Sequence, residues 1–207
     1  VTFHSGQVCC TATRWIVHKG IYDRFVDAAV KHLQSLRIGH ELNRGVQMGP
    51  VISEKQRRRV LSYIDRGREQ GAELVYQGVL PEAEGSQGGT YVAPALLAGD
   101  LENVAAREEI FGPVAYLTPF DDEEDAVRKV NATDYGLANS VWSRDLDRAH
   151  RVAEAMEAAN SWINAHNLFP HGVPCGGIKK SGMGGGVLSE QTLFDYLRAT
   201  SVVRPRQ

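Results

Sequence analysis

The sequence lacks the features that mark a membrane protein or a nucleic-acid-binding protein. No apolar run in its 207 residues approaches the roughly 20 residues that span a bilayer, and the amino-terminal end shows no basic region followed by an apolar stretch. Its 23 basic and 25 acidic residues are evenly scattered and give a net charge of −2, with no basic face and no acidic tail. We therefore expect no membrane partner and no nucleic-acid partner.

Cysteine is scarce as well. Only Cys9, Cys10 and Cys175 occur, and an adjacent pair with one distant residue cannot form a disulfide framework. Reduced thiols are the better interpretation, and a reducing compartment suits a thiol that takes part in chemistry. The sequence thus predicts a soluble protein of the cytoplasm.

What the sequence does have is an alternation of short strands and helices, and 43% of its residues are hydrophobic, enough for one well-buried domain and a short appendage. Apolar and β-branched runs predict strands at 14–18, 72–77, 91–97, 114–120, 139–142 and 161–165. Helical spacing and capping residues predict helices at 21–36, 53–70, 121–130 and 146–158. This order predicts an α/β fold, with a mainly parallel open sheet flanked by helices.

Three segments depart from the alternation. Residues 80–89 are rich in glycine, proline and glutamate, which predicts a surface loop. Residues 170–186 are rich in glycine and too poor in apolar residues to pack as an element, so we expect a functional loop there. Residues 194–203 alternate and carry β-branched side chains, which predicts a terminal strand that needs a partner edge.

Three short runs carry the chemistry. They are Phe3–Cys10 (FHSGQVCC), Glu108–Val114 (EEIFGPV) and Pro174–Gly182 (PCGGIKKSG). Taken in this order they resemble the active-site signatures of the NAD(P)-dependent aldehyde dehydrogenases, and the resemblance runs from Phe3 to about Val203. It covers only the later part of the family's sequence, and the chain begins without methionine, so we expect a fragment or a processed piece.

The resemblance implies the oxidation of an aldehyde to a carboxylic acid through a cysteine. The thiolate of Cys9 would add to the carbonyl to give a thiohemiacetal, hydride would pass to NAD or NADP, and water would hydrolyse the remaining thioester. Glu109 and Phe111 would hold the nicotinamide ribose. The substrate tunnel would be lined by Asn167, Phe169 and Cys175.

The same resemblance implies a catalytic domain over residues 1–193, followed by an oligomerisation strand and tail over residues 194–207. The likeness also implies a homo-oligomer joined through that strand. The family's cofactor-binding domain and its Glu-Leu-Gly-Gly segment, which carries the general base, are absent from the sequence. The missing domain is therefore an expected partner, and the isolated chain is expected to be inactive.

The residues themselves also admit plainer interpretations. Gly6 and Gln7 allow a tight backbone path on which N–H groups near Cys9 can hold an oxyanion, but Cys9 and Cys10 also fit small buried core residues. Neighbouring side chains cannot both face a substrate, so Cys10 is expected to be structural. A carboxylate can accept both ribose hydroxyls, but a Glu-Glu pair alone also fits a charged surface, and Glu108 is expected to be solvated.

Several positions depart from the family's pattern. His4 stands where asparagine is usual, and Gly185 and Gly186 stand where arginine and glutamate commonly follow Ser-Gly-x-Gly. Cys175 replaces a common phenylalanine, which predicts a wider and softer pocket. The spacing of His166, His171 and Cys175 matches no zinc signature, so we expect no metal.

Two other functions fit the sequence. A truncated, non-catalytic homologue would use its terminal strand as a subunit-interaction module and pair with a full-length relative. A thiol-esterase-like hydrolase would use a positioned cysteine and an oxyanion hole on activated esters without a cofactor.

Overall fold

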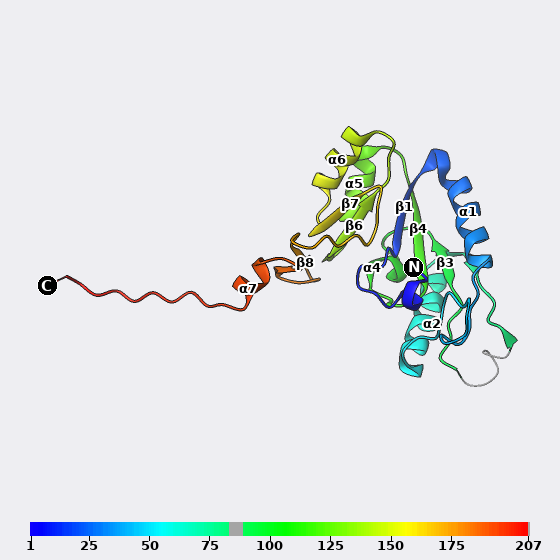
Figure 1. Ribbon diagram of the computed structural model, residues 1–207. Coiled ribbons are helices and arrows are strands. Elements are labelled where there is room, and N and C mark those ends of the chain that lie inside the picture. Colours follow the sequence, from blue (N-terminus) through cyan, green and yellow to red (C-terminus); the bar gives the residue numbers. More distant parts are fainter. Residues whose placement is uncertain (83–88, 207) are drawn as a thin grey trace. The chain divides into compact units, whose positions relative to one another are not determined.

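The computed structural model describes residues 1–82 and 89–206. The chain divides into two compact units, Val1–Thr133 and Asp134–Gln207. Each unit has its own sheets and helices (Figure 1). Among the described residues, no helix combines the length and the apolar character needed to cross a membrane.

The first unit is built on one four-stranded sheet with the strand order β1-β4-β3-β2. The strands are β1 (Arg14–His18), β2 (Glu73–Gln77), β3 (Ala95–Ala98) and β4 (Val114–Phe120). β4 lies between β1 and β3 and is parallel to both, whereas β2 pairs antiparallel with β3 at the edge. The predicted α/β fold with a mainly parallel sheet is confirmed in this unit.

Helices cover both faces of this sheet. Alternate side chains of β3 enter different cores: Leu97 packs with Val60 and Ile64 of α2 (Glu54–Glu69), while Leu96 packs with Leu33 of α1 (Tyr22–Gln34). All five side chains are at most 5% exposed. Because successive side chains of a strand point to opposite faces of the sheet, β3 packs against α2 on one face and against α1 on the other.

The other helical elements with described bounds in the first unit are shorter than α1 and α2. They are η1 (Phe3–Gly6), η2 (Lys19–Ile21), α4 (Val104–Arg107) and α5 (Glu123–Asn131). Capping residues define the starts of α2 and α5 as the sequence predicts: Ser53 Oγ accepts from Gln56 N–H before α2, and Asp122 accepts from Asp125 N–H before α5. The short helix α4 was not predicted.

Arg14 of β1 binds the carboxyl end of α5. Its guanidinium donates to the backbone oxygens of Lys129 at 2.8 Å, Val130 at 3.1 Å and Ala132 at 3.3 Å. These carbonyls have no partner within a helix end, so the guanidinium acts as a side-chain cap. Burial lowers the pKa of Arg14 from its ordinary value.

The second unit combines two small sheets. β6 (Ala138–Val141) and β7 (Asn160–Ile163) pair in parallel, and α6 (Leu146–Ala155) packs on them. The other sheet is antiparallel and has the order β5-β8-β9. Its strands, and the helix that follows them, are β5 (Tyr135–Gly136), β8 (Cys175–Lys179), β9 (Gly184–Val187) and α7 (Gln191–Asp195).

The predicted loop over residues 170–186 is wrong, because this segment contains β8 and most of β9. The two strands pair through their backbones and glycine lets them approach closely: a Cβ on Gly176 would lie 2.8 Å from the carbonyl of Gly184. The scarcity of apolar side chains therefore did not prevent strand formation.

Two other predicted segments lie in the first unit. The strand predicted over 91–97 begins only after Pro94, as β3. Most of the predicted loop over residues 80–89 lies outside the described residues.

The carboxyl-terminal segment has no strand of its own. Phe194 and Asp195, expected in the terminal strand, belong to α7, and residues 197–206 form neither helix nor strand (Figure 1). Val202 and Val203 are 93% and 89% exposed. A strand that forms only against the edge of another subunit requires that subunit, so the predicted oligomerisation strand stays a prediction.

Candidate active site

The segment that carries Cys9 follows an unusual backbone path. His4, Ser5 and Gly6 have φ values of 47°, 55° and 73°, three consecutive residues in the left-handed region. Ser5 is buried, and its hydroxyl donates to the carbonyl of Gly49 at 2.7 Å. The side-chain oxygen of Gln7 accepts from the N–H of Ile52 at 2.9 Å. These bonds fix the segment against the stretch that leads into α2.

The two adjacent cysteines have different surroundings. Cys9 is exposed, whereas Cys10 is 7% exposed, and their sulfur atoms lie 3.9 Å apart. The N–H of Thr11 donates to the carbonyl of Val8 at 2.9 Å, so a turn carries both thiols. Within the described part of the chain nothing accepts from the N–H of Cys9. Cys9 thus presents both an accessible thiol and a free backbone donor.

The second motif lies directly against the first. Residues 108–113, called here the Glu109 segment, pass so close to Gly6 that a Cβ on this glycine would lie 2.0 Å from the carbonyl oxygen of Gly112. Gly112 is equally confined on another side, because a Cβ there would lie 2.4 Å from a methyl carbon of Val60 in α2. The Glu109 segment is therefore held between α2 and the stretch from Ser5 to Thr11 that carries Cys9, called here the Cys9 segment.

Polar side chains of α2 bind the Glu109 segment. Gln56 donates to the carbonyl oxygens of Ile110 at 3.2 Å and Phe111 at 2.7 Å, and Arg59 donates to that of Glu109 at 2.6 Å. The sequence pattern assigned Gln56 to a capping box, but its amide group holds the segment instead. Phe111 has a φ of 60°, an uncommon conformation for a bulky residue that these contacts support.

The two glutamates of the motif differ in their contacts. Glu108 is exposed, as expected of a solvated neighbour, and its carboxylate also accepts from the hydroxyl of Tyr63 at 2.5 Å. The side chain of Glu109 is exposed, and no donor to its carboxylate occurs in residues 1–82 or 89–206. Sequence reasoning missed Gln56, Arg59 and Tyr63. The sequence did contain one sign of them: their spacing of three and four positions puts all three side chains on one face of the helix.

The third motif and its predicted pocket residues belong to the second unit. Phe169 is 42% exposed and packs edge-to-face on Trp162, with ring centroids 5.3 Å apart. Asn167 has a φ of 57° in the same loop, and the indole of Trp162 donates to the carbonyl of Leu168 at 2.6 Å. Cys175 is half-buried in β8, opposite Val187 of β9. The described residues contain no His, Cys, Asp and Glu group arranged for a metal ion.

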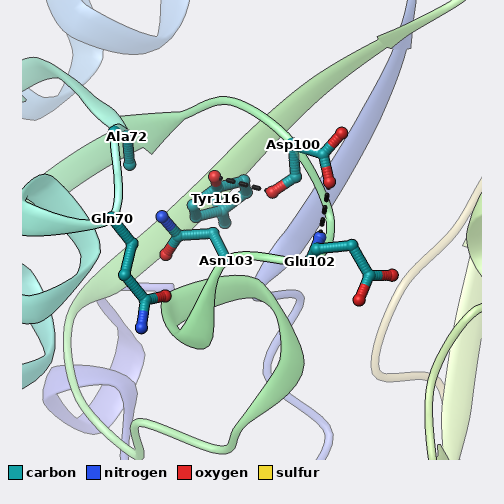
Figure 2. Close-up of a pocket in the computed structure, with 7 residues that line it drawn as sticks. Gln70, Ala72, Asp100, Glu102, Asn103 and Tyr116 are labelled. Carbon is teal, nitrogen blue, oxygen red and sulfur yellow. Dashed lines mark hydrogen bonds between the residues drawn. The ribbon is translucent and has the colours of Figure 1, made fainter.

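A hollow of about 240 Å³ elsewhere in the first unit contains none of the motif residues (Figure 2). Its lining consists of Gln70, Gly71, Ala72, Asp100, Glu102, Asn103 and Tyr116. The Tyr116 hydroxyl donates to the carbonyl of Asp100 at 2.8 Å, and burial raises the pKa of this hydroxyl to about 12. Gln70 accepts from the N–H of Val104, and Asn103 both accepts and donates within the fold. These bonds serve the structure, so the Cys9 and Glu109 segments are the candidate site.

The chain is also similar to known proteins. The model of the "Aldehyde dehydrogenase family" matches residues 1–202. Betaine aldehyde dehydrogenases of Mesorhizobium japonicum and Brucella anthropi are 43% and 42% identical over 183 residues, which is 88% of this chain and 38% of each relative. A crystal structure of betaine aldehyde dehydrogenase from Staphylococcus aureus in complex with NAD+ matches with a TM-score of 0.89 and 32% identity, over 94% of this chain and 39% of that chain. The chain thus spans about two fifths of the length of these relatives.

Proposed function

Because the chain belongs to the aldehyde dehydrogenase family, we propose that it supplies the catalytic part of an enzyme that oxidises an aldehyde to a carboxylic acid with NAD or NADP. The family model matches nearly the whole chain, and the S. aureus relative binds NAD+. Because the chain corresponds to only part of each relative, the activity belongs to this chain together with a cofactor-binding domain. Residues 1–193 form the catalytic domain in this proposal, and residues 194–207 form the strand that joins subunits.

Cys9 is the nucleophile. Its thiolate adds to the aldehyde carbonyl and forms a thiohemiacetal, whose oxyanion the Cys9 N–H can hold. NAD(P)+ supplies the acceptor for the hydride that leaves this carbon. The thioester that remains on Cys9 reacts with water, which releases the carboxylic acid and the thiol. The balance is one aldehyde, one water and one oxidised cofactor, giving one carboxylate, one reduced cofactor and two protons.

Glu109 fits the ribose of this cofactor. Its exposed carboxylate has two oxygens that can accept from two hydroxyls, and its backbone is anchored by Arg59. Phe111 provides an aromatic surface next to it. In the second unit, Asn167, Phe169 and Cys175 are proposed to line the substrate pocket, and the replacement of a common phenylalanine by Cys175 favours a bulkier or more polar aldehyde. The reduced thiols suit the cytoplasm.

A single observation carries the proposal: the segment that bears the exposed Cys9 contacts the Glu109 segment through Gly6 and Gly112, although about a hundred residues separate Cys9 from Glu109 in the sequence. A cysteine nucleophile and a cofactor clamp require this proximity, since hydride must pass between the two bound groups. Two glutamates that only form a charged surface and a cysteine that only fills a core would not require this proximity.

The first test is iodoacetamide labelling of the chain, followed by peptide mapping. Cys9 should react first, because it is exposed while Cys10 is buried. The second test joins the chain to the amino-terminal portion of the M. japonicum relative, and we call the product the hybrid enzyme. Cys9→Ser should lower its aldehyde oxidation by at least about a thousandfold. The control variant Cys10→Ala should stay active. Retained oxidation in Cys9→Ser, or an inactive but folded hybrid enzyme, contradicts the proposal.

The exposed carboxyl-terminal segment favours a second function, a non-catalytic module that pairs with another subunit. The apolar side chains concerned are Leu193, Phe194, Tyr196, Leu197, Val202 and Val203, each at least 59% exposed. Such a row of apolar residues favours a partner surface. This function is supported if the chain binds the full-length relative but the hybrid enzyme oxidises no aldehyde.

A further inference from the structure

Tyr63 lies on the face of α2 that binds the Glu109 segment. Its side chain is 4% exposed, and the guanidinium carbons of Arg59 and Arg66 lie 4.8 Å and 5.2 Å from the ring centroid. Two cations over one aromatic ring restrict its movement and favour this rotamer. Burial, together with the hydrogen bond to Glu108, raises the pKa of the Tyr63 hydroxyl. The hydroxyl therefore stays protonated at neutral pH and acts as a donor.

The Tyr63 hydroxyl and the Arg59 guanidinium bind consecutive residues. Tyr63 donates to the carboxylate of Glu108 at 2.5 Å, and Arg59, which lies over the Tyr63 ring, donates to the backbone oxygen of Glu109 at 2.6 Å. The carboxylate of Glu109 is thereby left exposed, with no donor in the described residues. An anchored backbone beside a free carboxylate is a preorganised arrangement, because the ligand does not have to order the segment.

We propose that Tyr63 is a positioning residue, which fixes Glu109 for the cofactor ribose by holding the neighbouring Glu108. This inference rests on the proposed function of Glu109. In this proposal the Tyr63 hydroxyl acts through Glu108, to which it donates, and not by binding substrate or cofactor itself. Gln56 and Val60 hold Phe111 and Gly112 independently, so the effect of Tyr63 is confined to the beginning of the segment.

The test compares Tyr63→Phe with Tyr116→Phe in the hybrid enzyme. Both variants remove one buried tyrosine hydroxyl in the first unit, but Tyr116 donates to the carbonyl of Asp100 and not to the Glu109 segment. Tyr63→Phe should raise the KM for the cofactor about tenfold, as expected for a lost hydrogen bond to a charged group. The KM for the aldehyde and the alkylation rate of Cys9 should not change. Tyr116→Phe should leave all three values unchanged.

Variants of the glutamates separate the possible outcomes. Glu108→Ala should reproduce Tyr63→Phe, whereas Glu108→Gln keeps an acceptor oxygen and should have a smaller effect. Equal values for Tyr63→Phe and Tyr116→Phe overturn the inference, and so does an equal rise in both KM values, since that indicates general loosening. Glu109→Ala distinguishes the two proposals. If it leaves the cofactor KM unchanged, the proposed role of Glu109 fails; if it raises that KM and Tyr63→Phe does not, only the role of Tyr63 fails.

Discussion

Replacing Gly6 by alanine tests whether the contact between the Cys9 segment and the Glu109 segment is as close as the structure shows. Two costs add at this position. A left-handed φ of 73° costs an alanine about 1 to 2 kcal/mol, and a Cβ placed 2.0 Å from the carbonyl oxygen of Gly112 forces one segment to move. Overpacking of this kind typically costs about 1 to 3 kcal/mol. The expected loss of unfolding free energy in Gly6→Ala is therefore about 2 to 5 kcal/mol.

Gly71→Ala is the matched control. Gly71 also has a left-handed φ, 90°, but a Cβ there would meet nothing within 4 Å, so only the conformational cost applies. The difference between the two variants isolates the collision with Gly112. In thermal unfolding followed by circular dichroism, each kcal/mol lowers the midpoint of a chain of this size by about 2 to 4 °C. Gly6→Ala should also change the alkylation rate of Cys9. If Gly6→Ala melts at the same temperature as Gly71→Ala, the proposed close contact is wrong.

Three further predictions follow from the same structure. The isolated 207-residue chain should oxidise no aldehyde with NAD or NADP, because it spans only 38% of the M. japonicum relative and the proposed activity requires a cofactor-binding domain as well. Hydride transfer measured by absorbance from the purified chain would refute the proposed domain division. Deletion from Tyr196 onward should reduce the oligomeric state of the hybrid enzyme in light scattering, and an unchanged mass argues against the terminal strand. The hydrogen bond from Lys129, aided by the N–H of Asp121, lowers the pKa of Asp125. The stability that results is fully present above the ordinary aspartate pKa of about 3.9 and is lost as the pH falls through the lowered pKa. The urea concentration at the unfolding midpoint should therefore fall less steeply with decreasing pH in Asp125→Asn than in the unchanged chain. An equal fall in both proteins contradicts the assignment.

Local signals in the sequence predicted much of the first unit. The apolar runs at β1 and β4 match the observed strands. β4 is buried along most of its length, as a central strand covered on both faces requires, whereas β1 at the edge of the sheet is mostly half-buried. Ser53 and Asp122 mark the starts of α2 and α5, because a cap acts on backbone groups only two or three residues away. Such interactions are readable without knowing the rest of the fold.

Long-range backbone contacts were not predictable in this way. The pairing of β8 with β9 depends on glycines that permit a close approach, and glycine at these positions resembles a flexible loop in the sequence. The motifs did identify Cys9 and Glu109, but the side chains that hold them lie about fifty positions from Glu109. The sequence indicates a cap for Gln56 and no role for Tyr63, because a hydrogen bond of this span leaves no local pattern.

The bonds of Arg14 fix more than the end of one helix. Because β1 lies at the edge of the first sheet, its guanidinium attaches α5 to that edge just before Thr133, where the first unit ends. The last helical turn of this unit is therefore held by a residue five positions after Cys9. Lysine could not take over this role, since a single ammonium group lacks the planar fork of donors that reaches three carbonyls at once. A charged side chain near the start of the sequence thus fixes the last helix of the first unit.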